Sequence, residues 1–158
     1  MYLKEYACRQ GEYKMLTDVF ESFSESETYQ FGKKIAEENE GSGVFVLEGD
    51  LGAGKTVFAK GFASGLGITE TVTSPTFTIM QVYEGKGRTL YHYDAYRIED
   101  PTELEEIGYT DYFYGDGVCL IEWAGNIASY LPEHYTCISI EREEDKGFDY
   151  RKITVKKI

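Results

Sequence analysis

Apolar residues fall into short runs of two kinds, separated by glycine-rich turns. Residues 44–47, Val-Phe-Val-Leu, form a continuous apolar run that is typical of a buried strand. Apolar side chains at 57, 58, 59 and 62 have helical spacing, so we expect a helix from about residue 55 to 66, stopped by Gly65 and Gly67. The intervening loop is rich in glycine. This part of the chain is predicted to be a strand-loop-helix unit.

The N-terminal side of this unit predicts one strand and one helix. Residues 13–23 alternate well enough for a strand. A helix with Ser24 or Ser26 as its cap should follow, with acidic residues in its first turn, and end at the glycines of 41–43.

The C-terminal side predicts two hairpins, a helix and a strand. Residues 76–94 indicate two strands around a Gly-Lys-Gly turn, with Asp94 at the end of the second. A helix with Asp100 as its cap and Pro101 at its first position should close near Gly108. Residues 117–123 then predict an apolar strand, and residues 135–158 a C-terminal hairpin.

Length and charge narrow the class of protein. A chain of 158 residues can form one domain with a sizeable core, so residues 1–158 are interpreted as a single domain. A net charge of −12 disfavours tight binding of nucleic acid by this chain alone, because such binding depends on Lys and Arg that neutralise phosphates. No apolar run is long enough to span a membrane, and the N-terminus lacks a signal-peptide core, so we expect a cytoplasmic protein.

The three cysteines indicate neither a disulfide framework nor a zinc site, because they are odd in number and widely spaced. Cys119 and Cys137 lie in apolar runs and are expected to be buried small hydrophobic residues.

The loop between the predicted strand and helix carries the strongest chemical signal. Residues 49–56, Gly-Asp-Leu-Gly-Ala-Gly-Lys-Thr, match the pattern G-x-x-x-x-G-K-[ST]. Successive backbone N–H groups of such a loop, at the start of a helix, form a concave site for phosphate oxygens. Lys55 would reach the β and γ phosphates, and the Thr56 hydroxyl would bind Mg²⁺. A glycine turn with only a structural role is the alternative.

Two acidic residues at predicted strand ends are candidates for the chemistry. A bound triphosphate with Mg²⁺ needs a second carboxylate near the metal and a group that orients the nucleophile. Asp94 is the candidate carboxylate that binds the metal, and Glu122 is the candidate group that positions or activates the nucleophile. Both are chosen because parallel strands of such folds present their C-terminal ends to the loop. The alternatives are a turn-capping role for Asp94 and a surface position for Glu122.

Residues around these two acids have open roles. In the Thr-Ser-Pro-Thr-Phe segment at 73–77, Ser74 or Thr76 could offer a hydroxyl to magnesium or phosphate, although an ordinary turn is the alternative. His92 should share a strand face with Asp94. Arg97 could pair with Asp94, contact phosphate or be solvated, and Trp123 could lie in the core or near the nucleotide.

Four motifs, taken in order and spacing, resemble the TsaE (YjeE) family. They are Gly-Asp-Leu-Gly-Ala-Gly-Lys-Thr at 49–56, the 73–77 segment, the run from His92 to Phe113 that contains H-x-D-x-Y-R and D-P-x-E-L-E-x-x-G, and Cys-Leu-Ile-Glu-Trp at 119–123. The likeness covers residues 24–140, and residues 1–13 look like an extension beyond the usual start.

This resemblance implies a three-layer P-loop NTPase fold of the α/β class, with a mixed, largely parallel central sheet. It implies ATP and Mg²⁺ as cofactors, and a role in threonylcarbamoyladenosine modification of tRNA with the TsaD and TsaB proteins, through which tRNA would be contacted indirectly. Lys55, Asp94 and Glu122 would be catalytic, and Thr56, Asp94 and Glu122 would serve the metal. The residues expected to bind the nucleotide are Asp50, Leu51, Gly52, Ala53, Gly54, Lys55, Thr56, Val57, Thr76 and Trp123.

Two functions share this loop and metal. One is an ATPase that hydrolyses ATP to reset a complex of partner proteins; hydrolysis should be slow alone, because no arginine in the chain is an obvious finger. The other is a small-molecule kinase, which would also need a lid with arginines and a pocket for an acceptor. The few arginines and the short aromatic segment 109–116 favour the ATPase.

Overall fold

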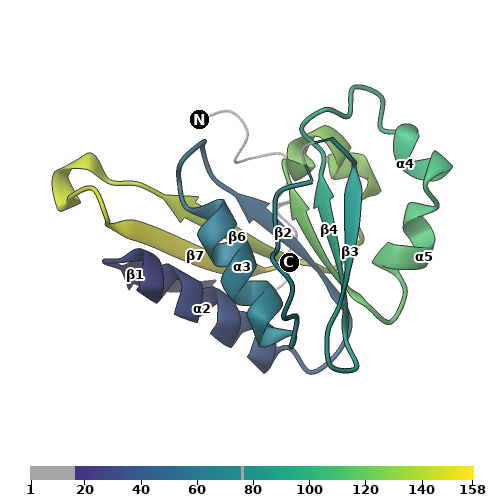
Figure 1. The fold of residues 1–158 in the computed structure, drawn as a ribbon. Coiled ribbons are helices and arrows are strands. Elements are labelled where there is room, and N and C mark those ends of the chain that lie inside the picture. The colour runs from purple at the N-terminus through teal and green to yellow at the C-terminus, as the bar shows by residue number, and fades with distance from the viewer. Residues whose placement is uncertain (1–16, 76) are drawn as a thin grey trace.

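The computed structural model describes residues 17–75 and 77–158. They form a seven-stranded sheet with helices on both faces (Figure 1). The strands are β1 (Thr17–Ser22), β2 (Gly43–Glu48), β3 (Met80–Glu84), β4 (Thr89–Asp94), β5 (Val118–Glu122), β6 (Thr136–Glu141) and β7 (Arg151–Lys157). The helices are α2 (Glu25–Glu38), α3 (Lys55–Gly65), α4 (Glu103–Glu106), α5 (Tyr109–Phe113) and the 3₁₀ helices η1 (Ala124–Tyr130) and η2 (Glu144–Lys146).

The strand order places the parallel strands at the centre of the sheet. The order is β1-β7-β6-β2-β5-β4-β3. The four central strands, β6, β2, β5 and β4, are parallel to one another, and antiparallel pairs lie at the two edges. The expected mixed sheet, the β3-β4 hairpin and the C-terminal β6-β7 hairpin are therefore confirmed. Because β2, β4 and β5 are parallel, their C-terminal ends lie side by side at the same end of the sheet.

The two faces of the sheet are covered differently, which gives the expected three layers. Helices α2 and α3 cover one face over a core that includes Phe45, Leu47, Phe58, Phe62 and Leu120. The short helices α4, α5 and η1 cover the other, where the alternate positions of the same strands point. Within the described residues, no helix has the length and apolar character needed to cross a membrane.

Helices α2 and α3 approach each other closely because glycines face the contact. A Cβ on Gly61 would lie 2.0 Å from the Tyr29 carbonyl oxygen, and one on Gly32 would lie 2.4 Å from that of Phe58. Helix α2 begins at Ser24, whose hydroxyl accepts a hydrogen bond from the Glu27 N–H at 3.1 Å, as the sequence predicts. Helices α2 and α3 therefore pack against each other as a pair on one face of the sheet.

The predicted helix between Asp100 and Gly108 is wrong in extent. Only residues 103–106 are α-helical, after a tight turn in which the Leu104 N–H bonds the Pro101 carbonyl. Gly108 has a left-handed conformation with φ of 68°, and a second short helix, α5, follows. Asp100 still caps the turn by accepting the Thr102 N–H at 3.0 Å, which lowers the pKa of its carboxyl.

The predictions for the cysteines and for the N-terminal residues can be compared with the structure only in part. Cys119 and Cys137 are buried, as expected, and burial raises the pKa of the Cys119 thiol to about 12. Cys8, the extension at 1–13 and the first part of the predicted strand at 13–23 lie outside the described residues.

Candidate nucleotide-binding site

The glycine loop at 49–56 joins the end of β2 to the start of α3. Gly52 and Gly54 have φ angles of 76° and 106°, a region that residues other than glycine rarely adopt. Gly49 is needed for close approach, because a Cβ there would lie 2.8 Å from the carbonyl oxygen of Ile140 on β6. The loop therefore has the backbone freedom and the position at a helix start that a phosphate site requires.

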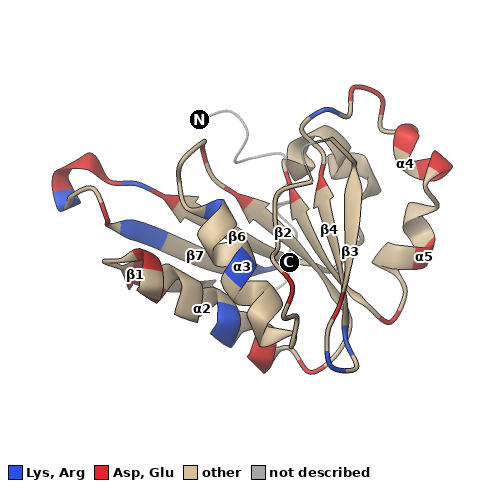
Figure 2. Ribbon diagram, in the orientation of Figure 1, with Lys and Arg blue, Asp and Glu red and all other residues tan. Residues whose placement is uncertain are grey.

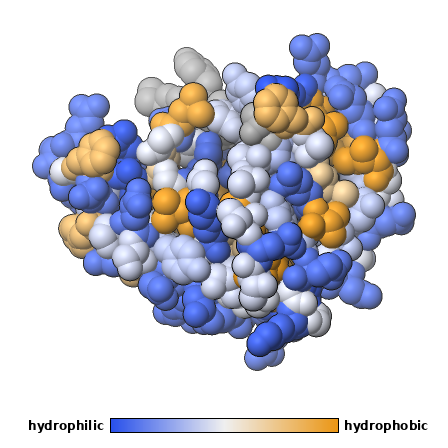
Figure 3. Space-filling model, in the orientation of Figure 1, coloured by the Kyte–Doolittle hydropathy of each residue, from blue (hydrophilic) through white to orange (hydrophobic). Residues whose placement is uncertain are grey.

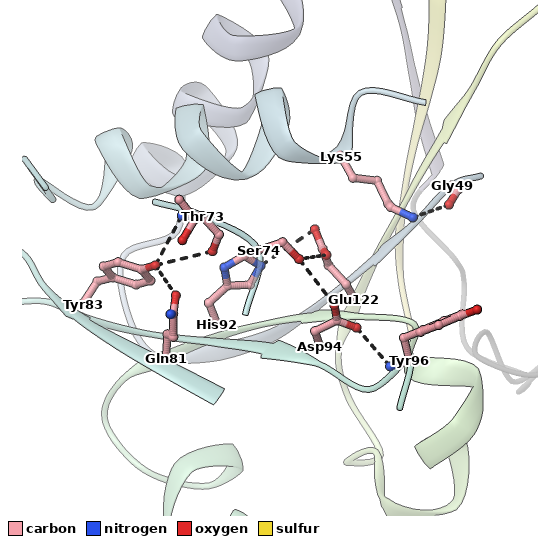
Figure 4. A network of polar contacts seen from close by, with 10 residues as sticks. All are labelled: Gly49, Lys55, Thr73, Ser74, Gln81, Tyr83, His92, Asp94, Tyr96 and Glu122. Atoms are coloured by element: carbon pink, nitrogen blue, oxygen red, sulfur yellow. Dashed lines mark hydrogen bonds and ion pairs between the residues drawn. The ribbon is translucent and has the colours of Figure 1, made fainter. Parts of the chain in front are cut away.

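Lys55 lies at the start of α3 and points back over the loop. Its Nζ donates a hydrogen bond to the Gly49 carbonyl at 2.5 Å (Figure 4). The same Nζ lies 4.1 Å from the centroid of the Trp123 ring. Burial lowers the pKa of the Lys55 ammonium, while the carboxylates of Glu122, Asp94 and Asp50 oppose that shift. A partly desolvated ammonium beside a glycine loop is suited to an anionic ligand.

Asp94 and Glu122 come together where the parallel strands end. They are register partners at the ends of β4 and β5. The Ser74 hydroxyl lies 3.3 Å from Asp94 Oδ2 and 3.5 Å from Glu122 Oε2 (Figure 4). Glu122 is only 4% exposed, so the alternative of a surface carboxylate is wrong. Asp94 also accepts the Tyr96 N–H at 3.0 Å, so it caps a turn as well as joining the cluster.

His92 lies buried beside this pair. It shares a face of β4 with Asp94, as predicted, and is 1% exposed. Its Nε2 lies 3.8 Å from Glu122 Oε1, and neither ring nitrogen has a hydrogen-bond partner among the residues described. The imidazole therefore lies next to Glu122 without a hydrogen bond to it.

Three other predicted residues have different outcomes. Trp123 lies at the site rather than in the core, with φ of 57°, and its ring packs 5.1 Å from that of Tyr96. Arg97 lies 5.3 Å from the Phe77 ring, and no ion pair with Asp94 is formed within the described residues. Thr76 falls outside the described residues, so its predicted role in sensing the nucleotide stays a prediction.

A cleft of about 1310 Å³ opens beside the loop. It is lined by the loop, by residues 123–126 after β5, by residues after β4, and by the end of β6.

Figure 2 shows acidic residues at the tips of the parallel strands, and Figure 3 shows separate hydrophobic patches on an otherwise hydrophilic face. Leu51, in the loop, is 86% exposed and Phe77 is 91% exposed.

The residues present fit a nucleotide with magnesium better than a metal held by protein alone. Among the residues described, no group of three or more His, Cys, Asp or Glu side chains could hold a metal ion. Thr56 is exposed in the first turn of α3, and Asp94 and Glu122 supply two carboxylates. Mg²⁺ commonly takes one or two carboxylates and completes its shell with phosphates and water.

One residue at the loop was missed by sequence reasoning. Arg151, at the start of β7, donates a hydrogen bond from Nε to the Ala53 carbonyl at 2.6 Å. The two residues are 98 positions apart, and no motif marks the arginine. Only the pairing of β7 with β6, next to β2, brings it there.

Fold and site together define a P-loop NTPase fold of the α/β class. The family described as threonylcarbamoyl adenosine biosynthesis protein TsaE matches residues 22–153. The chain therefore belongs to the TsaE family, as its motifs indicated.

Several relatives show the same likeness. The chain is 55% identical over 111 residues to the tRNA threonylcarbamoyladenosine biosynthesis protein TsaE of Bacillus subtilis, covering 70% of this chain and 67% of the relative. It is 46% identical over 134 residues to the Treponema pallidum protein of the same name, covering 85% and 96%. The crystal structure of Bacillus subtilis YdiB superposes with a TM-score of 0.77 and 40% identity, covering 92% of this chain and 88% of that one.

Proposed function

We propose that this protein is an ATPase of tRNA threonylcarbamoyladenosine biosynthesis that hydrolyses ATP to ADP and phosphate. The observation that supports this most is that Asp94 and Glu122, at the ends of neighbouring parallel strands, lie close enough to act electrostatically on Lys55 at the glycine loop. Phosphoryl transfer depends on positioning and charge neutralisation, and these are the groups that such chemistry needs. The acceptor is water, and the protein works in the cytoplasm.

Each residue has a defined part in this proposal. The loop amides and the Lys55 ammonium bind the phosphates, and Thr56 and Asp94 hold the hydrated cation. Mg²⁺ supplies charge neutralisation at the phosphates when it is bound. Glu122, buried and contacted by Ser74, orients the attacking water and accepts its proton.

The partners in this proposal are the TsaD and TsaB proteins, and hydrolysis resets their complex. The net charge of −12 supports contact with tRNA through these partners rather than directly. Arg97 and Arg142 line the cleft, but each guanidinium lies over an aromatic ring, Phe77 and Phe148 respectively. We therefore expect slow hydrolysis by the isolated protein that the partners raise.

The kinase alternative loses support from the segment 109–116. Helix α5 packs on the sheet through buried Phe113, whose ring contacts those of Tyr93 and Tyr109. A segment that forms part of the core is poorly suited to be a lid.

Two measurements test the proposal. Incubation with γ-labelled ATP and a metabolite panel should release labelled phosphate to water, whereas transfer of label to a metabolite would establish the kinase. Native mass spectrometry with TsaD and TsaB should show a complex that depends on whether ATP or ADP is present. Brisk hydrolysis by the pure protein that TsaD and TsaB leave unchanged would contradict the proposed role.

A further inference from the structure

Arg151 ties the glycine loop to the C-terminal hairpin. Its Nε donates to the Ala53 carbonyl at 2.6 Å, and its Nη1 lies 2.7 Å from both the Phe148 and the Tyr150 carbonyls. One rigid guanidinium thus bonds three backbone carbonyls from two segments distant in the chain. Charge-assisted hydrogen bonds of this kind are stronger than neutral ones.

The hairpin side of this contact is itself braced. The Tyr150 hydroxyl donates to Glu21 Oε1 on β1 at 2.7 Å, and the Lys146 ammonium lies 3.2 Å from the same oxygen. Tyr150 is 2% exposed. Arg151 therefore extends toward the loop from a fixed base, and its three contacts fix the guanidinium plane.

The bonded carbonyl belongs to the peptide that begins the helix. A trans peptide is planar, so the Ala53 carbonyl and the Gly54 N–H point in opposite directions. Gly54 has φ of 106°, and glycine at that angle can rotate readily unless its peptide is held. Bonding of the Ala53 carbonyl to Arg151 fixes the direction of the Gly54 N–H away from β7.

We propose that Arg151 is a positioning residue of the phosphate site, holding the Ala53–Gly54 peptide so that the Gly54 N–H is available to a polyphosphate. This inference rests on the proposed function, because it assumes that the loop binds a nucleotide. Arg151 itself acts through the loop backbone and needs no contact with the ligand.

Arg88 offers a matched control for a purely structural arginine. Its Nη1 donates to the Ala36 carbonyl at 3.0 Å and its Nη2 to the Gly41 carbonyl at 2.9 Å. It therefore also bridges backbone carbonyls, but at the end of α2 rather than at the loop. Arg88→Gln should lower thermal stability without any selective effect on ligand binding.

The experiment compares Arg151→Gln, Arg151→Lys and Arg88→Gln by calorimetry with Mg·ADP and by thermal unfolding without ligand. Arg151→Gln should raise the Kd about tenfold, the equivalent of one charge-assisted hydrogen bond, while kcat at saturating ATP changes little. Arg151→Lys keeps the positive charge but loses the planar guanidinium that bonds several carbonyls at once. Its Kd should therefore lie between those of the wild type and Arg151→Gln. A Kd for Arg151→Gln equal to that of Arg88→Gln would overturn the inference.

A second readout does not depend on nucleotide or on the stability of the Gln variant. In NMR spectra of the ligand-free protein, the Gly54 amide chemical shift should change in Arg151→Lys but not in Arg88→Gln. The Gly54 amide proton should also exchange with solvent faster in Arg151→Lys than in wild type or Arg88→Gln. If wild-type protein binds no Mg·ADP, the proposed function fails, and the Gly54 amide still reports whether Arg151 holds the peptide. An unchanged Gly54 resonance would refute the positioning role by itself.

Discussion

The two halves of the candidate site are held together in different ways. On the loop side, contacts to backbone carbonyls are short, at 2.5 Å for Lys55 to Gly49 and 2.6 Å for Arg151 to Ala53. On the acidic side, the contacts between side chains are longer, at 3.3 to 3.8 Å, although Asp94 also accepts the Tyr96 N–H at 3.0 Å. The buried His92 nitrogens have no hydrogen-bond partner in the described part of the chain.

This difference separates binding from chemistry. A loop whose carbonyls are held by Lys55 and Arg151 keeps its backbone amides in place to bind phosphates. Carboxylates that are brought together with long contacts can still adjust to a cation and a water. Substitutions on the loop side should therefore change affinity, and substitutions on the acidic side should change turnover.

The largest expected effect is that of Lys55→Ala on the loop side. Removing the ammonium leaves phosphate charge without its partner in a partly desolvated site, so the Kd for Mg·ATP should rise roughly 10²- to 10³-fold. Calorimetry measures it, with Lys60→Ala, an exposed lysine on the same helix, as the control. Tight binding by Lys55→Ala would show that the loop does not hold phosphates as proposed.

Glu122→Gln should give the opposite pattern on the acidic side. Loss of the general base should lower turnover roughly 10²- to 10³-fold, while the isosteric amide leaves the Kd for Mg·ATP within about threefold. Phosphate release and calorimetry on the same preparation separate the two quantities. Glu84→Gln, at the end of β3, is the control, and normal hydrolysis by Glu122→Gln would exclude the role given to this residue.

Ser74→Ala should have a smaller effect on the same side. Its hydroxyl contacts both carboxylates at distances of 3.3 and 3.5 Å, so its loss should lower turnover by about threefold to tenfold, as expected for one weak hydrogen bond. Steady-state kinetics should show the change in kcat rather than in KM. A change confined to KM would place Ser74 on the binding side instead.

The pH dependence of binding gives the mildest test. Burial lowers the pKa of Lys55, and only its charged form attracts phosphate, so affinity should fall as pH rises through that lowered pKa, before an ordinary lysine with a pKa of 10.5 would titrate. The Kd for Mg·ADP should rise about threefold to tenfold across this range. Lys55→Ala should lack this dependence, and an equal dependence in both proteins would assign it to another group.

Much of the fold was predictable because its signals are local. The apolar run of β2, the spacing of α3 and the serine cap of α2 each depend on neighbouring residues, and the structure confirms them. The helix from Asp100 to Gly108 was mispredicted in extent, because the chain first makes a tight turn after Asp100 and only residues 103–106 are α-helical. The left-handed Gly108 ends this segment, and α5 follows it as a separate helix.

The candidate site divides in the same way. Asp94 and Glu122 were found as strand ends, but their common hydroxyl contact, Ser74, is separated from Glu122 by 48 positions. The alternatives for Trp123 and Arg97 could be separated only by seeing which rings and charges surround them. Arg151 had no sequence signal at all.

By itself, the sequence determined the phosphate loop, because consecutive backbone amides and three glycines form such a site within one short stretch. The tertiary structure alone decided which distant side chains meet it. Parallel pairing of β2, β4 and β5 sets the two carboxylates beside the loop, and the β6-β7 hairpin delivers Arg151 to the Ala53 carbonyl. Contacts of this kind join residues that are far apart in the sequence, and the order of the strands in the sheet decides which of these residues meet.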